Sequence, residues 1–258
     1  ARGVLPRASG PNPVADGVSE TLLVLNTAQQ EHAVPSSSTA ASLRRYLLLP
    51  AIAFLLVLLP ETIMSATSSS APERAEDTHP MKPGATMPDS AVATLEGHKK
   101  LLSEVLGAKP AVLVFYRGGW CPYCNTQLSG LRKIIGDLND LGVQLIAVSP
   151  DSPESLKAGL EKTPVEYQLL SDSSAELIQA LGIAFKVDEA TREKYQGYGI
   201  DLEKASGGQD HFLLPVPSVY MVDANRIIRF QHSDPDYKVR LEEGAVLAAA
   251  KQMMQSQP

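Results

Sequence analysis

Apolar and polar positions follow two different periods in the second half of the chain. Short apolar runs at 111–116 and 143–149 are rich in β-branched residues and predict buried strands. Between them, leucines and isoleucines recur at spacings of three and four positions and predict an amphipathic helix over 121–141. The same patterns predict further elements: a helix at 152–161, a short strand at 167–170 and a helix at 174–181.

The alternation of strands and helices with short connections predicts an α/β fold with parallel strands covered by helices. The pattern then loosens, because 184–214 is polar and glycine-rich without a strong period, and we expect a loose insertion there. Beyond it, apolar runs at 218–222 and 227–231 flank an Asp-Ala-Asn-Arg turn and predict a hairpin. A last helix is predicted over 241–254. Together these elements predict one domain over 89–258.

The first part of the chain follows neither pattern. Residues 1–42 are rich in Ala, Ser, Pro and Val, and we expect an unstructured or wrongly assigned extension there. Arg44 and Arg45 then precede an uncharged apolar run at 46–60, which small residues follow. A basic region, a short apolar region and small residues are typical of a secretory signal, which we expect over 43–71.

Two other interpretations of this apolar run stay open. A membrane span normally needs about 20 apolar residues, so a retained anchor would be short, and a core helix is the third alternative. The segment predicts export, either into the periplasm or to a membrane-anchored position that faces the periplasm or the exterior. Residues 72–88 are polar and proline-rich, and we expect them to form a linker.

Composition and charge exclude several classes of protein. An apolar fraction of 44% excludes wholesale disorder. A net charge of -6 does not provide the basic surface that a nucleic-acid-binding protein needs, so no nucleic-acid partner is expected. Two cysteines in 258 residues are too few for a disulfide-built scaffold or a four-cysteine zinc module.

The two cysteines lie close together, at Cys121 and Cys124, where the predicted helix follows the first strand. The start of a helix presents unpaired N–H groups and the positive end of the helix dipole, which stabilise a thiolate. Cys124 lies one turn further along the same side of the helix. Pro122 suits the first turn, because its missing N–H would be unpaired there anyway. This arrangement predicts a redox-active dithiol.

An inert disulfide and a zinc site are the alternatives. A disulfide across so short a loop removes little chain entropy and would add little stability. A zinc ion would need two more ligands, and the histidines of the domain lie at no recognisable spacing: His98, His211 and His232. No metal or organic cofactor is expected, because dithiol chemistry needs only the two sulfurs.

The segment Phe115–Cys124 (FYRGGWCPYC) is similar to the peroxiredoxin-like branch of the alkyl hydroperoxide reductase and thiol-specific antioxidant family. The similarity extends over about 83–252 and includes four further motifs, at 148–151, 199–202, 214–217 and 234–237. This resemblance implies a thioredoxin-like fold, in which a central mixed sheet is flanked by helices. It also implies an antioxidant oxidoreductase that acts through thiols.

The resemblance implies roles for individual residues. Cys121 would be the attacking thiolate and Cys124 the resolving thiol. Pro217 would be the cis-proline that faces the two cysteines, or else an ordinary proline at the start of a strand. Arg117 would raise the positive potential at the site or lie solvated in its loop. Trp120 would pack beside the cysteines or cover the edge of the sheet.

Other positions near the motif receive supporting or structural roles. Pro122 and Tyr123 separate the cysteines and would support the site. Three residues of the predicted insertion are expected to serve packing or the surface rather than catalysis: Tyr195, Tyr198 and His211. Typical peroxiredoxins carry Thr or Ser three residues before the attacking cysteine and Pro four residues further back. Gly118 and Val114 stand at these places here.

Three functions stay open. The protein is predicted to reduce peroxides through Cys121, to close a disulfide with Cys124, and to be re-reduced by a thioredoxin-like protein or a small thiol. The second hypothesis is a thioredoxin- or glutaredoxin-like oxidoreductase that acts on protein disulfides. The third is a non-catalytic interaction module with an oxidised cysteine pair. A membrane tether is expected only if the signal segment is not cleaved.

Overall fold

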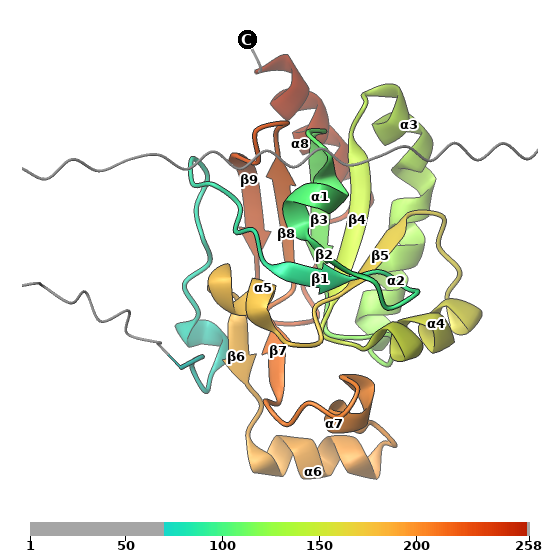
Figure 1. Cartoon of the computed structure of the whole chain (residues 1–258), viewed down its shortest axis with the longest axis vertical. Helices are drawn as coiled ribbons and strands as arrows, with labels where there is room; N and C mark the ends of the chain where they lie inside the picture. Colours follow the sequence, from blue (N-terminus) through green and yellow to red (C-terminus); the bar gives the residue numbers. More distant parts are fainter. Residues whose placement is uncertain (1–69, 257–258) are drawn as a thin grey trace, which may run out of the picture. The chain divides into compact units, whose positions relative to one another are not determined.

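The computed structural model describes residues 70–256 (Figure 1). The predictions for 1–42 and almost all of the predicted signal at 43–71 lie outside these residues. In the part that is described, no helix is long and apolar enough to cross a membrane.

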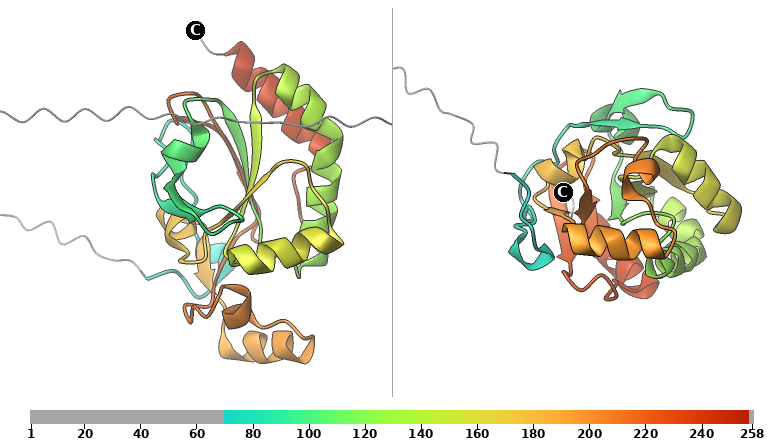
Figure 2. Two further views of the ribbon diagram at one scale, coloured as in Figure 1. Left: turned by 45° about the vertical axis from the view of Figure 1, so that its right-hand side comes forward. Right: turned by 90° about the horizontal axis from the view of Figure 1, so that it is seen from below.

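A seven-stranded mixed sheet forms the centre of the described part (Figures 1 and 2). Its strands are β1 (Ala91–Ala93), β2 (Lys99–Leu101), β3 (Ala111–Phe115), β4 (Gln144–Ser149), β5 (Gln168–Ser171), β8 (Ser218–Val222) and β9 (Ile228–Ser233). Their order across the sheet is β2-β1-β5-β4-β3-β8-β9. Strands β3, β4 and β5 run parallel, and β8 and β9 continue the sheet as the predicted antiparallel hairpin. The predicted α/β fold is confirmed.

Helices cover both faces of the sheet (Figure 2). On one face lie α2 (Pro122–Leu131), α3 (Ile135–Asp140), α4 (Pro153–Lys162) and α8 (Glu243–Gln255), and on the other lie α1 (Leu102–Leu106) and α5 (Glu176–Ala180). Side chains of β3 alternate between two buried clusters: Val112 and Val114 belong to the first face, and Leu113 and Phe115 to the second. This burial on both faces explains why β3 is apolar at every position.

The predicted helix over 121–141 is broken into two. A 3-10 turn at Arg132–Ile134 separates α2 from α3. The backbone of Ile134 leaves the helical region, with φ -106° and ψ 2°. Gly130 and Gly136 lie on either side, and glycine lowers the stability of a helix interior. The apolar positions stay on one buried face across the break, so their spacing could not reveal it.

The predicted loose insertion at 184–214 is instead structured. It contains a small sheet of β6 (Ala184–Lys186) and β7 (Leu213–Pro215), together with α6 (Glu189–Gly197) and α7 (Leu202–Ala205). Neither helix has a buried residue, which explains the missing apolar period. Caps define them instead: Asp188 accepts a hydrogen bond from the Thr191 N–H at 2.9 Å, and Asp201 one from the Lys204 N–H at 3.0 Å.

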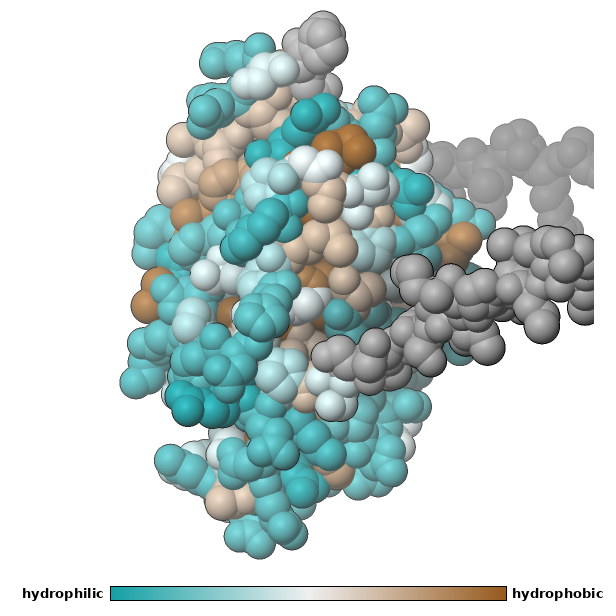
Figure 3. All heavy atoms as spheres, turned by 90° about the vertical axis from the view of Figure 1, so that its left-hand side faces the viewer, coloured by the Kyte–Doolittle hydropathy of each residue, from teal (hydrophilic) through white to brown (hydrophobic). Residues whose placement is uncertain are grey.

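Residues 72–88, which the sequence predicts to be a linker, pack against the rest of the domain. The N–H of His79 donates to the Gly182 carbonyl at 3.0 Å, and the N–H of Gly84 donates to Ile228 at 2.8 Å. Met87 is buried in the core. Figure 3 views the molecule from the side of this segment and shows a mostly hydrophilic surface with small, separate apolar spots. Backbone hydrogen bonds rather than an apolar run attach the segment, so its composition resembles that of a linker.

Candidate active site

The two cysteines lie where α2 begins, and the first of them follows the carboxyl end of β3 by six residues. Cys121 is the N-cap residue of α2, with extended backbone at φ -89° and ψ 114°, and Pro122 takes the first helical turn as predicted. Cys124 lies in that same turn. Both cysteines are buried and neither forms a disulfide in this structure. The helix start therefore brings the two thiols together in a site that excludes bulk water.

The two thiols have opposite shifts in pKa. A hydrogen bond from the Cys124 side chain is the main cause that lowers the pKa of Cys121 to about 6. The Cys124 backbone and the charges of Arg117 and Arg240 act in the same direction, whereas burial opposes them. Burial raises the pKa of Cys124 well above its ordinary value, and the hydrogen bond to Cys121 adds to this. At neutral pH, Cys121 is therefore a thiolate and Cys124 keeps its proton.

Arg240 is the site residue that the sequence analysis missed. It lies in the loop between β9 and α8, and its Nη2 is 3.3 Å from Cys124 Sγ and 4.0 Å from Cys121 Sγ. Its other nitrogens are held by the Gln127 side chain at 3.1 Å and by the Tyr237 carbonyl at 2.9 Å. The motif at 234–237 was noticed in the sequence, but nothing in the local pattern places a residue three positions later beside the sulfurs.

Arg117 is buried among aromatic rings and is not solvated. It is only 4% exposed, and its guanidinium carbon lies 4.3 Å from the ring centre of Tyr237, 5.1 Å from that of Trp120 and 5.5 Å from that of Tyr195. Its Nη2 also donates a hydrogen bond to the Tyr195 hydroxyl. Its positive charge is thereby fixed beside Cys121, where it raises the positive potential at the site.

Asp151 is a second residue whose place in the site was not predicted. It follows β4, is 3% exposed, and its Oδ2 accepts a hydrogen bond from the Gly119 N–H at 2.7 Å. Burial raises the pKa of Asp151 to about 7, against the hydrogen bond from the Gly119 N–H, and the charge of Cys121 raises it further. This carboxyl group therefore holds the turn that leads from β3 to Cys121, which we call the redox turn (117–120).

The structure explains why Gly118 replaces the usual Thr or Ser. A Cβ at this position would collide with the Trp120 indole and would lie 2.8 Å from Asp151 Oδ1. The backbone there also has φ +153°, which side-chain-bearing residues rarely adopt. Trp120 and Asp151 occupy the space that a hydroxyl-bearing side chain would need. The departure from the family pattern is thus part of a differently built turn.

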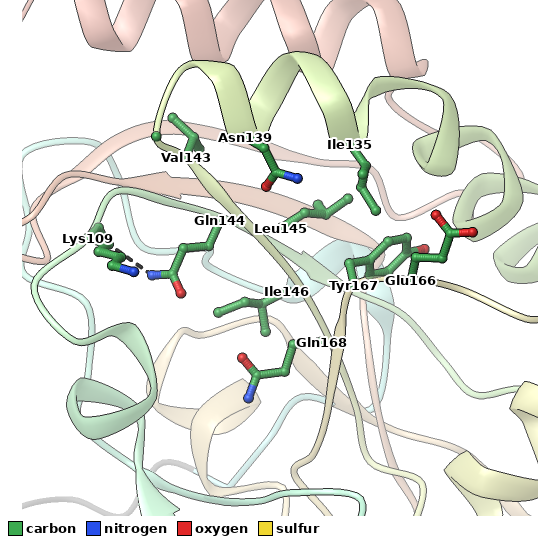
Figure 4. Close-up of a pocket in the computed structure, with 11 residues that line it drawn as sticks. Lys109, Ile135, Asn139, Val143, Gln144, Leu145, Ile146, Glu166, Tyr167 and Gln168 are labelled. Atoms are coloured by element: carbon green, nitrogen blue, oxygen red, sulfur yellow. Dashed lines mark hydrogen bonds between the residues drawn. The ribbon is translucent and has the colours of Figure 1, made fainter.

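Cavities lie at both ends of the sheet. A cavity of about 300 Å³ borders the redox turn and is lined by Gly119, Trp120 and Asp151, by α4, and by the connection from α6 to α7. A larger one, of about 520 Å³, lies at the amino ends of β4 and β5, where Gln144, Tyr167 and Gln168 line it (Figure 4). Because Cys121 follows the carboxyl end of β3, which is parallel to β4, the larger cavity is at the opposite end from the thiols.

Comparison with known proteins agrees with this architecture. Residues 83–231, more than half of the chain, match the AhpC/TSA family. The chain belongs to the AhpC/TSA family. Peroxiredoxin Bcp of Escherichia coli K12 is 29% identical over 105 residues, which are 41% of this chain and 67% of that protein. Peroxiredoxin Q of Sedum lineare is 31% identical over 100 residues, 39% of this chain and 53% of the relative.

Solved structures show that this AhpC/TSA protein has the peroxiredoxin form of the thioredoxin-like fold. Peroxidoxin BcpB of Mycobacterium tuberculosis superposes with a TM-score of 0.52 at 18% identity, over 69% of this chain and 99% of the other. Reduced Prx3 of Vibrio vulnificus, in complex with hydrogen peroxide, superposes with a TM-score of 0.55 at 19% identity, over 67% of this chain and 98% of the other. Family and relatives together confirm the predicted class, a thiol-dependent peroxidase.

The other predicted site residues of this AhpC/TSA protein are placed as follows. Pro217 is buried between β7 and β8, and β8 pairs with β3; its cis geometry stays a prediction. Tyr123 is 43% exposed and stacks edge-on against Tyr237 at 5.7 Å. Tyr198 is 69% exposed, whereas His211 is half-buried and joins the insertion to the segment before α5, with its Nε2 2.9 Å from the Ser173 carbonyl.

Within residues 70–256, no three His, Cys, Asp or Glu side chains gather as metal ligands would.

Proposed function

We propose that Cys121 is the attacking thiolate of this peroxidase and that Cys124 resolves the product. The Cys121 thiolate attacks one oxygen of a hydroperoxide, the O–O bond breaks, and Cys121 becomes a sulfenic acid while the other oxygen leaves as an alcohol or water after taking up a proton. The Cys124 thiol then displaces the sulfenic hydroxyl as water, and a Cys121–Cys124 disulfide forms. Two electrons from an external thiol reductant restore the dithiol.

The observation that supports this assignment is the opposite shift of the two thiols. The low pKa of Cys121, about 6, makes it the nucleophile at neutral pH, while the raised pKa of Cys124 keeps a proton ready for the leaving hydroxyl. Arg240 lies within reach of both sulfurs and can follow the negative charge from one to the other.

A dithiol exchange with protein disulfides is the second candidate function. It is favoured by the Cys-x-x-Cys pair at a helix start and by the absence of a hydroxyl at Gly118, since exchange needs no group to orient a peroxide. The exposed aromatic pair Tyr123 and Tyr237 lies next to the thiols, where a protein substrate would dock. Family membership does not support the third hypothesis, a non-catalytic module.

The test uses the reduced protein and the variants Cys121→Ser and Cys124→Ser. Wild type is expected to consume one equivalent of peroxide faster than free cysteine does at the same pH, and to gain one intramolecular disulfide by mass spectrometry. Cys124→Ser should stop at a sulfenic acid that a dimedone probe traps, and Cys121→Ser should not react. A wild-type rate equal to that of free cysteine would refute the peroxidase assignment, and insulin reduction that depends on Cys121 would then favour exchange.

The reductant and the location are proposals that the sequence supports. A thioredoxin-like protein or a small thiol fits a two-cysteine cycle, because either can attack a disulfide that lies at a helix start. Export, with or without a retained membrane anchor, is supported by the basic, apolar and small-residue order at 43–71. Fractionation of cells that express the full chain distinguishes a released protein from a tethered one.

A further inference from the structure

Helix α6 touches the active site through one side chain. None of its residues is buried, so it has no apolar face that would hold it against the domain. Its Tyr195 nevertheless packs against Trp120 of the redox turn, with ring centres 5.5 Å apart and ring planes at 50°, and accepts a hydrogen bond from Arg117. Figures 1 and 2 show α6 and α7 near the end of the sheet from which α2 starts.

Arg117 depends on this contact. Within residues 70–256 no carboxylate forms an ion pair with it, and its Nε has no hydrogen-bond partner. A guanidinium that is only 4% exposed has lost most of its water, and each missing hydrogen bond then costs free energy. The Tyr195 hydroxyl is the acceptor that its side chain reaches among the described residues.

We propose that Tyr195 is a positioning residue, which holds the Arg117 guanidinium beside Cys121 and thereby helps to keep Cys121 charged. Tyr195 does not touch the sulfur, so its effect passes through Arg117. Without the hydroxyl, the guanidinium gains by turning toward solvent and leaves the thiolate. This inference deepens the proposed function, because it makes α6 and the insertion part of the machinery that activates Cys121.

The charge on Cys121 has several contributors, and the test must separate Tyr195 from them. The titratable and charged groups that face this thiol are Cys124 on α2, Arg117 on the redox turn, Asp151 after β4 and Arg240 before α8. Tyr195→Phe removes the hydroxyl and leaves all of these groups in place. Tyr198→Phe is the matched control, because Tyr198 is three residues away at the end of the same helix and is 69% exposed.

The measurement is the rate at which Cys121 is alkylated by iodoacetamide between pH 4 and 10, followed at Cys121 by peptide mass spectrometry in each variant with Cys124 retained, since the raised pKa of Cys124 keeps that thiol protonated. Tyr195→Phe is expected to react about threefold more slowly at pH 6 and at the unchanged rate at pH 9, because only the thiolate fraction falls. Tyr198→Phe should follow its parent at every pH. Alkylation needs no peroxide, so the result does not depend on whether the protein reduces peroxides.

A double-mutant cycle identifies the route of the effect. If Tyr195 acts through Arg117, Tyr195→Phe should change nothing further in an Arg117→Met background. An unchanged pH profile in Tyr195→Phe, an equal shift in Tyr198→Phe, or a shift that persists in Arg117→Met would each overturn the proposal.

Discussion

The two ends of the central sheet differ in the groups that they bring together and in the size of their cavities. At the carboxyl end of β3, two thiols, two guanidiniums and a carboxyl group surround a turn that borders a cavity of about 300 Å³. At the amino ends of β4 and β5, a larger cavity of about 520 Å³ is lined by amide, apolar and exposed polar side chains, with no cysteine among them. Reactivity follows the groups that shift a thiol pKa, and not the volume of a cavity.

The largest effect is expected when a charge is removed from the reactive end. Arg240→Met keeps much of the side-chain volume but deletes the guanidinium that is 3.3 Å from Cys124 Sγ. The pKa of Cys121 should rise, because a charge that favours the thiolate is lost, and reaction with peroxide at pH 6 should slow about threefold. Stopped-flow measurement of the peroxide rate against pH tests this.

Lys238→Met is the matched control for Arg240, because it removes one positive charge from the same loop at an exposed position. It should leave the pH profile unchanged. Equal slowing in both variants would mean that the general potential of the loop matters and that the contact of Arg240 with the sulfurs does not.

At the end of the sheet that carries the thiols, the sequence predicts those features that depend only on residues close together in the chain. The helix start, Pro122 and the two cysteines follow from residues close together in the chain, and so does the strand before them. Arg240 and Asp151 could not be found in this way, because they arrive from other loops and only the tertiary fold brings them to Cys121. Gly118 shows the same limit: its departure from the family pattern makes sense only with Trp120 and Asp151 in place.

The fold divides in a similar way. The longer strands β3, β4, β5, β8 and β9 and the helices packed on one face of the sheet were predicted, since burial itself creates their period. The short elements β1, β2, α1 and β7 were not predicted, because a few residues are too short to show a period. Helices α6 and α7 were missed because hydrogen-bonded caps and Tyr195 hold them, and neither leaves an apolar pattern. Residues 72–88 were predicted as a linker because their attachment uses backbone groups, which every sequence has.

A smaller effect is expected from Asp151, and its size depends on pH. The pKa of this carboxyl is raised from its ordinary value of 3.8 to about 7 on folding, so the folded state binds its proton more tightly. Its contribution to stability is fully present below pH 3.8 and is lost as the pH rises through about 7. The contribution of Cys121, whose pKa falls from 9.0 to about 6, has the opposite sign: it is present above pH 9.0 and lost as the pH falls through about 6.

Asp151→Asn isolates the first contribution. Relative to wild type, the variant should gain stability as the pH rises from 4 to 8, by up to about 1.4 kcal/mol for each unit of pKa shift that is removed. Urea unfolding of reduced protein at several pH values measures this difference. A difference that is independent of pH would show that the buried carboxyl does not titrate in this range. The pKa of Asp172 is also raised to about 7 by burial, but this side chain caps α5 away from the thiols. Asp172→Asn therefore shows how much of the pH dependence comes from the burial of a carboxyl group alone.

The smallest effect is expected at the end with the larger cavity. Tyr167 lines that cavity (Figure 4), and its hydroxyl donates a hydrogen bond to the Leu128 carbonyl at 2.8 Å. Tyr167→Phe should lower the free energy of unfolding by about 1 kcal/mol, since a buried carbonyl loses one donor. The rate with peroxide and its pH profile should stay those of wild type. Leu128 belongs to α2, the helix that also carries Cys124. A change in the pH profile would therefore show that the two ends of the sheet are coupled through this helix and do not act independently.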